Sequence, residues 1–307
     1  MQTILGAGGN IGNELAKSLT KFTTDIRLVS RNPKKVNNTD QIMAADLTDP
    51  NQVDKAVEGS EVVYVTIAFD YKAKIWKETW PPLMKAVIQS CKKHKAKLVF
   101  FDNMYMYDCN HLSTMTEETP VRPTSEKGEV RRQVAAMVMD EVNNGNLTAL
   151  IARAPDFISP TNSILTQSVY GNLKKGKKAD WFADADKIHN FIYWVDAAKA
   201  TALLGNTPDA YGQVWHLPSI KDKLTGKQWV ELVAKALNDE PKIAVLPVWM
   251  MSIVGLFIPI IREFREMAYQ YDRDYYFDSS KFEKRFGYQA FTAEEAIREL
   301  IRYMEKK

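Results

Sequence analysis

The chain has 307 residues, of which 45% are hydrophobic and 26% are charged. These fractions are ordinary for a soluble globular protein and exclude intrinsic disorder, which combines low hydrophobicity with high net charge. The 41 Lys and Arg residues nearly balance the 38 Asp and Glu residues and are spread along the chain, which argues against a nucleic-acid partner. Two cysteines, Cys91 and Cys109, are too few for a disulfide framework, and the first residues lack the basic head of a signal peptide, so we expect a cytoplasmic protein.

Short apolar runs alternate with helical patterns in the first half of the chain. Continuous apolar runs are typical of parallel strands that are buried on both faces of a sheet. The predicted strands are Thr3–Leu5, Ile26–Val29, Ile42–Ala45, Val62–Ile67, Leu98–Phe101 and Ala149–Ala152. Apolar residues at helical spacing predict helices near residues 11–19, 50–57, 76–88 and 130–138. This alternation predicts an α/β fold with a doubly wound parallel sheet, the Rossmann arrangement.

The pattern loosens after about Pro160. Helices are predicted over residues 165–173, 195–204, 226–237 and 293–304, and strands over residues 191–193 and 214–217. We expect residues 1–160 to form the Rossmann domain and residues 187–218 to return to it. The remainder of 161–307 then forms mostly a smaller C-terminal lobe for a substrate.

Residues Ala244–Ile261 form a strongly apolar stretch. The stretch is at the short end for a transmembrane helix, is interrupted by Pro247 and Pro259, and is followed by charged residues. We therefore expect no membrane partner. The preferred interpretation is a strand ending within Ile243–Leu246 followed by a buried helix. An alternative is a helix that lines or covers an apolar substrate pocket.

A glycine-rich turn follows the first predicted strand directly and opens the first predicted helix. Gly6, Gly9 and Gly12 are three residues apart. In a dinucleotide-binding turn the first glycine permits a tight turn, the second lets the backbone approach a pyrophosphate, and the third lets the helix pack closely on the strand. The helix N-terminus at Asn10 and Ile11 would supply N–H groups to the phosphates. This context predicts a dinucleotide site, and a turn that only packs is the alternative.

The residue that reads the adenosine ribose is expected at the end of the second strand. An acidic side chain there would bind the 2′-hydroxyl and favour NAD, but the sequence reads Ser30-Arg31. A guanidinium can hold a 2′-phosphate through two hydrogen bonds, so Arg31 predicts a preference for NADP(H) over NAD(H). A solvated basic loop is the alternative. Asp46-Leu47, at the end of the third strand, either approaches adenine or, through Asp46, caps the turn that follows.

With these segments in this order, the chain resembles the extended short-chain dehydrogenase/reductase superfamily, of the NAD(P)-dependent epimerase/dehydratase type, over nearly its whole length. Four further stretches carry the resemblance, and they read VVYVTIA at 62–68, RAPDFISP at 153–160, HNFIYWVD at 189–196 and YGQVWHL at 211–217. The resemblance implies that Ile67 and Ala68 approach the nicotinamide ribose and that Pro155 contributes to the cofactor site.

The chain departs from this family where the chemistry is expected. The family uses a serine or threonine, then a tyrosine and a lysine four residues apart. Asn103 falls at the hydroxyl position, and Lys127 and Arg131 fall at the tyrosine and lysine positions. Arg131 cannot shuttle protons but could hold ribose hydroxyls. Lys127 could be a base if burial and Arg131 disfavour its charged form, and a solvated lysine is the alternative. Tyr105 and Tyr107 are further candidates for the acid or else packing residues, and Asn103 could polarise a carbonyl.

We therefore expect an enzyme that uses NADP(H), an oxidoreductase or epimerase with a nonstandard acid/base site and a small carbonyl or sugar-like substrate. The alternative is a noncatalytic NADP(H)-binding redox sensor, which the missing tyrosine favours. No metal is expected, because the four histidines lack metal-ligand spacing. The oligomeric state stays open, with a homodimer as one alternative.

Overall fold

The computed structural model describes residues 1–306, which form two compact units. The first unit consists of Met1–Met106, Lys127–Ala154 and Val195–Leu217. The second consists of Tyr107–Glu126, Pro155–Trp194 and the described residues from Pro218 onward. The segment Tyr107–Glu126 lies in the second unit because Met115 forms a parallel bridge with Phe277 and its N–H donates to the carbonyl of Tyr276.

The first unit is built on a seven-stranded sheet with the order β10-β6-β5-β4-β1-β2-β3, in which all neighbours are parallel. The strands are β1 (Gln2–Leu5), β2 (Ile26–Ser30), β3 (Gln41–Ala44), β4 (Val62–Val65), β5 (Lys97–Asn103), β6 (Ala149–Ala154) and β10 (Val214–His216). The chain winds outward from β1 through β2 to β3, and then resumes at β4 on the other side of β1. Open α/β sheets bind ligands beyond the carboxyl ends of the strands at such a reversal, which here lies between β1 and β4.

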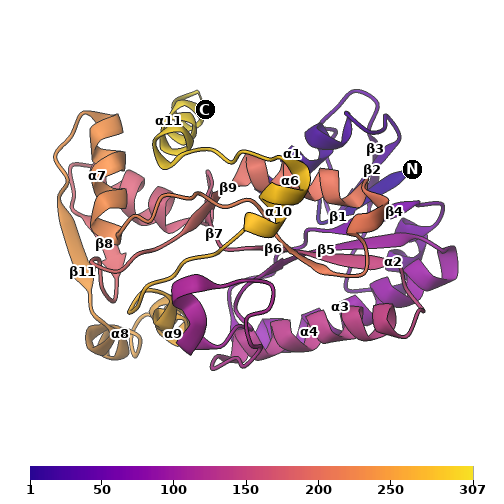
Figure 1. Cartoon of the computed structure of the whole chain (residues 1–307), viewed down its shortest axis with the longest axis horizontal. Coiled ribbons are helices and arrows are strands. Elements are labelled where there is room, and N and C mark those ends of the chain that lie inside the picture. Colours follow the sequence, from indigo (N-terminus) through magenta and orange to yellow (C-terminus); the bar gives the residue numbers. More distant parts are fainter. Residues whose placement is uncertain (307) are drawn as a thin grey trace. The chain divides into compact units, whose positions relative to one another are not determined.

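Helices cover both faces of this sheet, with α3 and α4 on one face and α1 and α6 on the other (Figure 1). The helices of the unit are α1 (Asn10–Leu19), α2 (Pro50–Val57), α3 (Ala73–His94), α4 (Glu126–Asn143) and α6 (Trp194–Gly205). Residues of α2, α3 and α4 form one continuous apolar core with the strands, including the fully or almost fully buried Trp80, Phe100 and Val134. This core fixes the positions from which side chains reach the carboxyl edge of the sheet.

The second unit contains two pairs of parallel strands and several short helices (Figure 1). The strands are β7 (Asp156–Ile158), paired with β9 (Phe191–Tyr193), and β8 (Ala179–Phe182), paired with β11 (Ile243–Leu246). The helices are α5 (Gly171–Leu173), α7 (Gly226–Leu237), α8 (Val248–Val254), α9 (Pro259–Glu266), α10 (Ser280–Phe286) and α11 (Ala293–Glu305). Thr225 and Thr292 each form a capping box that fixes where α7 and α11 begin.

The predicted fold class is confirmed, and each predicted strand is present. The strand at residues 191–193 has the predicted ends, and the others are shifted by one or two residues. β4 ends at Val65 instead of Ile67, because the backbone of Ile67 leaves the ladder to pack against Gly6. The helix predicted over residues 165–173 is a π-helical turn, Leu165–Tyr170, continued by α5.

The prediction for residues 244–261 is partly wrong. The strand β11 is present, but two short helices, α8 and α9, follow it in place of one buried helix. Of the residues in these helices, only Met251 is buried. None of the helices within residues 1–306 combines the length and the apolar character that crossing a bilayer requires.

Candidate functional site

The glycine-rich turn lies between β1 and α1, at the point where the strand order reverses. Gly6 has φ of +98°, and a Cβ at this position would lie 2.7 Å from the Cα and N atoms of Ile67. A Cβ on Gly12 would lie 3.0 Å from the carbonyl oxygen of Gly6. The first and third glycines are therefore required by contacts within the protein, as the sequence predicts.

Gly9 is different, because nothing among the described residues explains why it lacks a side chain. Its φ of −79° and ψ of 171° suit any residue, and a Cβ there would meet no atom within 4 Å. Gly9 is also the N-cap of α1, whose end has no side-chain cap within the described chain and no acidic residue in its first turn. This arrangement leaves open space beside a helix N-terminus, which favours an anion.

The ends of β2 and β3 carry the residues predicted to bind the adenosine half of a dinucleotide. Arg31 is exposed and follows β2 directly, and Ser30 pairs with Ala44 of β3. Asp46 Oδ1 accepts hydrogen bonds from the N–H of Thr48 (3.0 Å) and from its hydroxyl (2.7 Å). These bonds lower the pKa of the Asp46 carboxyl, with a smaller lowering from the charge of Arg31. Asp46 therefore caps the turn, and an adenine contact would have to use its other oxygen.

A buried charge cluster lies behind the carboxyl ends of β5 and β6. Asp102 is fully buried, and its Oδ1 lies 3.3 Å from Nε of Arg131 while its Oδ2 lies 3.2 Å from Nη2 of Arg153. The guanidinium of Arg131 also lies 4.2 Å from the ring centre of Trp80. Burial lowers the pKa of Arg131, and the charge of Asp102 opposes that shift. Arg131 is thus built into the interior of the unit, and the ribose contact predicted for it stays a prediction.

Lys127 is fully buried in the first turn of α4, so the alternative of a solvated lysine is wrong. Its Nζ lies 4.7 Å from the ring centre of Tyr71, which is in the loop after β4. Tyr71 donates a 3.5 Å hydrogen bond to the hydroxyl of Tyr105, and the ring of Tyr105 stacks on Trp76. The two phenols are half-buried, so a ligand can reach them more easily than it can reach Lys127.

Asn103, the last residue of β5, is half-buried, and its Oδ1 accepts a hydrogen bond from the N–H of Tyr105 (3.1 Å). This bond holds the turn after the strand and orients the amide, whose nitrogen is the group that could donate to a carbonyl. Asn103, Tyr105 and Lys127 all belong to the first unit. Tyr107 and Pro155 belong to the second unit and are buried, and Tyr107 forms an antiparallel bridge with Val121. The burial of Tyr107 favours its packing alternative.

Tyr71 is the residue that sequence reasoning missed. Its signal was its position, since it follows the fourth strand closely and so lies at the same sheet edge as Asn103. The remaining predicted contacts lie along that edge. Asn10 and Ile11 form the first turn of α1, Leu47 packs against the apolar core, and Ala68 is exposed after β4.

The second unit holds a separate polar cluster around His189. The Nε2 of His189 lies 2.9 Å from Asp156 Oδ2, which also accepts a 2.8 Å hydrogen bond from the hydroxyl of Tyr271. The imidazole is stacked between the rings of Tyr271 and Tyr275, at 4.3 and 4.5 Å. This packing gives His189 a structural role. Within residues 1–306, no group of three or more His, Cys, Asp or Glu side chains could hold a metal ion.

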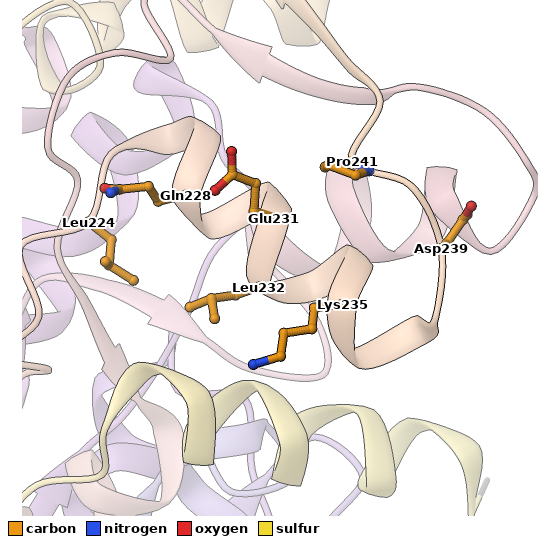
Figure 2. A pocket seen from close by; sticks show the side chains of 7 residues that line it. All are labelled: Leu224, Gln228, Glu231, Leu232, Lys235, Asp239 and Pro241. Atoms are coloured by element: carbon orange, nitrogen blue, oxygen red, sulfur yellow. The ribbon is translucent and has the colours of Figure 1, made fainter.

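An open depression of about 430 Å³ lies beside α7 in the second unit (Figure 2). It is lined by residues of α7 and of the loops at its two ends, including Gln228, Glu231 and Lys235. Figure 2 shows Glu231 and Lys235 pointing in different directions, and Lys235 lies 3.2 Å from Glu294 of α11. The depression offers no converging polar groups, so the candidate site remains the carboxyl edge of the first unit's sheet.

The fold of this chain is similar to that of several solved structures over almost its whole length. A dTDP-glucose 4,6-dehydratase from Streptomyces venezuelae, with NAD bound, matches 99% of this chain and 97% of its own, at 15% identity and a TM-score of 0.80. A UDP-glucuronic acid 4-epimerase from Bacillus cereus, in complex with NAD, matches 100% of this chain and 97% of its own, at 16% identity and a TM-score of 0.78. At these identities the similarity shows the fold.

Sequence comparison identifies the family. The uncharacterized protein y4nG of Sinorhizobium fredii is 19% identical over 295 residues, which is 93% of this chain and 73% of the relative. The model of the NAD dependent epimerase/dehydratase family matches residues 3–217, which is more than half of the chain. The resemblance drawn from the sequence motifs is confirmed, and the chain belongs to the NAD dependent epimerase/dehydratase family.

Proposed function

We propose that the protein is an NADP(H)-dependent oxidoreductase or epimerase that acts on a small carbonyl or sugar-like substrate. The dinucleotide would lie along the carboxyl edge of the first unit's sheet. Gly9 and the start of α1 would face the pyrophosphate, Arg31 the 2′-phosphate, and Ile67 with Ala68 the nicotinamide ribose. When bound, the nicotinamide supplies hydride transfer, and this chain supplies the positioning and the proton.

The observation that carries the proposal is the open space at Gly9. Gly6 and Gly12 are explained by contacts with Ile67 and with the carbonyl of Gly6, and Gly8 is explained by its φ of +102°. A side chain at Gly9 would meet no protein atom within 4 Å, yet it would fill the space in front of the N-terminus of α1. Open space at a helix N-terminus, where the partial charge is positive, supports the binding of a pyrophosphate there.

The test is calorimetric titration of NADPH into the parent and into Gly9→Val. The backbone of Gly9 suits valine, so the variant is expected to fold as the parent does and to lose dinucleotide binding. Thr20→Val, an exposed change at the opposite end of α1, is the matched control and should bind as the parent does. A folded Gly9→Val variant that binds NADPH as tightly as the parent would overturn the assignment of this turn.

For the proton, we infer that Tyr105 is the group that touches the substrate. Its hydroxyl would donate a proton to the substrate oxygen, while Tyr71 donates a hydrogen bond to that same hydroxyl. The ammonium of Lys127, next to the Tyr71 ring, would stabilise the negative charge left on the phenol pair. The side-chain amide of Asn103 would donate to the substrate carbonyl. Lys127 is then a positioning residue, since it is fully buried.

The substrate class is tested with a panel of small ketones, free sugars and nucleotide sugars. Steady-state NADPH oxidation detects net reduction, and NMR of the products detects epimerisation, which leaves the redox state of the cofactor unchanged. The panel includes dTDP- and UDP-sugars, because the solved relatives are a dTDP-glucose dehydratase and a UDP-glucuronic acid epimerase. Turnover with one class supports an enzyme. Tight NADPH binding without turnover of any member, in either redox direction, supports the noncatalytic redox sensor instead.

A further inference from the structure

Two short helices of the second unit and the turn between them expose an unusual set of large apolar side chains. Leu256 and Phe257, in the turn, are each 80% exposed, and Trp249 is 64% exposed. We call this surface the α8–α9 tip, and it consists of Trp249, Ile253, Leu256, Phe257, Ile258 and Ile260. Isolated exposed apolar residues are normal, but a contiguous group of this kind marks an interaction surface.

The α8–α9 tip is held in a fixed conformation by contacts within the second unit. Gly255 brings the two helices together so closely that a Cβ would lie 2.9 Å from the carbonyl of Met251 and 3.2 Å from the backbone of Arg262. Met251 anchors α8 by full burial, and Phe264 anchors α9 by stacking on Phe182 of β8 at 5.2 Å. The apolar residues are therefore presented by a fixed scaffold and do not have to be ordered by the partner.

The charges next to the tip indicate what kind of partner it fits. On α9, Arg262 and Arg265 are exposed, whereas Glu263 and Glu266 are half-buried. The two arginines of α9 are therefore more accessible from the surface beside the tip than its two glutamates are. Apolar side chains that project from a turn, flanked by exposed arginines and a tryptophan, are typical of segments that enter the interface of an anionic bilayer.

We propose that the α8–α9 tip inserts into the interfacial layer of a membrane with anionic lipids, so that the protein binds the membrane surface without crossing it. The sequence predicted no membrane partner, because the apolar stretch is short for a transmembrane helix, and binding at the membrane surface differs from that prediction. Leu256 and Phe257 would enter the acyl boundary, Trp249 would lie at headgroup level, and Arg262 with Arg265 would contact lipid phosphates. The proposal does not depend on the reaction assigned to the first unit.

The experiment is co-sedimentation of the full chain with vesicles of phosphatidylcholine alone and of phosphatidylcholine mixed with phosphatidylglycerol. The parent should sediment with the anionic vesicles, and less with the neutral ones. The double variant L256S/F257S should lose partitioning by roughly 100-fold, because two large apolar side chains no longer leave water. R262Q/R265Q should lower binding to anionic vesicles to the level of neutral ones. Phe22→Ser, which removes an exposed aromatic residue in the first unit, is the matched control and should have no effect.

A second readout uses Trp249 itself. Vesicles with brominated acyl chains should quench the parent's tryptophan fluorescence, and Trp249→Phe should remove that quenching while vesicle binding persists. The proposal is overturned if the parent stays in the supernatant with both vesicles, or if L256S/F257S sediments as the parent does. It is also overturned if the parent ignores vesicles but forms a dimer that L256S/F257S dissociates, since the tip then binds a second copy.

Discussion

The glycine turn and the start of α4 lie in the same unit and depart from the family pattern to different degrees. At the turn, both residue types and geometry follow the pattern, and the space at Gly9 is open. At α4 the resemblance is one of spacing alone, because the positions proposed for the family's tyrosine and lysine are occupied by Lys127 and Arg131, and both side chains are buried. The difference teaches that the part of the site that would hold a dinucleotide and the part that would move a proton are separable. A chain can keep the first while rebuilding the second from other elements.

The largest effect is expected when the hydroxyls of Tyr105 and Tyr71 are removed one at a time, which tests the proposed proton-transfer site. Tyr105→Phe should lower turnover roughly 10²–10⁴-fold with little change in NADPH affinity, because a proton donor is lost and the cofactor contacts are not. Tyr71→Phe should have a smaller effect of the same kind. Lys127→Met should shift the alkaline limb of the pH–rate profile to higher pH, because a nearby cation favours the phenolate. A purely structural role of Lys127 would not produce this shift.

Tyr107→Phe is the control for these variants, because Tyr107 is buried in the second unit. Once a substrate is found, full turnover in Tyr105→Phe, Tyr71→Phe and Lys127→Met would end the assignment of this site.

The buried charge cluster of Asp102, Arg131 and Arg153 should affect the stability of the fold, whereas the phenols should affect turnover. Asp102→Asn leaves Arg131 and Arg153 buried without their shared carboxylate, and we expect the free energy of unfolding to fall by about 3–5 kcal/mol. Urea denaturation measures this change. Asp54→Asn, which removes a carboxylate paired with the exposed Lys93 and with His94, should cost far less, because Asp54 is partly open to solvent. Equal losses in the two variants would contradict the central place given to Asp102.

The variant Arg31→Ala, at the carboxyl end of β2, tests the preference of the dinucleotide site for NADP(H) over NAD(H). Loss of a bidentate phosphate contact should weaken NADP(H) binding by about 1.5–3 kcal/mol and leave NAD(H) binding unchanged. Calorimetry with both dinucleotides measures the difference, and Lys34→Ala, a change of a nearby exposed cation, is the control. Tighter binding of NAD(H) than NADP(H) by the parent would refute the preference.

The smallest expected effect concerns Asp46. Its hydrogen bonds to Thr48 lower the pKa of its carboxyl in the folded protein, so they stabilise the fold above the ordinary aspartate pKa and are lost as the pH falls through the lowered value. Thr48→Ala should raise the pKa of Asp46 toward its ordinary value and reduce this acid-dependent loss of stability. Carboxyl NMR titration measures the shift, with Thr23→Ala as a control, and an unchanged pKa would be inconsistent with the capping role.

The sequence predicts the sheet well because its signals are local. Apolar runs identify the strands, and the spacing of Gly6, Gly9 and Gly12 identifies the turn. The contact between Tyr71 and Lys127 could not be predicted in this way, since it depends on how β4 and α4 are arranged in space. Periodicity also cannot distinguish an apolar segment that is buried from one that is presented to a partner. For this reason the α8–α9 tip was expected to be a buried helix.

The sheet's last strand has a consequence for how the chain folds. β10 pairs with β6, and β6 is flanked on its other side by β5. Between β6 and β10 the chain leaves to build β7, β8 and β9 of the second unit. During synthesis the first unit therefore cannot close its sheet until the ribosome has released residues far beyond Ala154, and loop-closure entropy makes such distant pairing slow. A fragment that stops at residue 160 would leave β6 as an unprotected edge strand, so we expect it to aggregate instead of folding as an independent dinucleotide-binding domain.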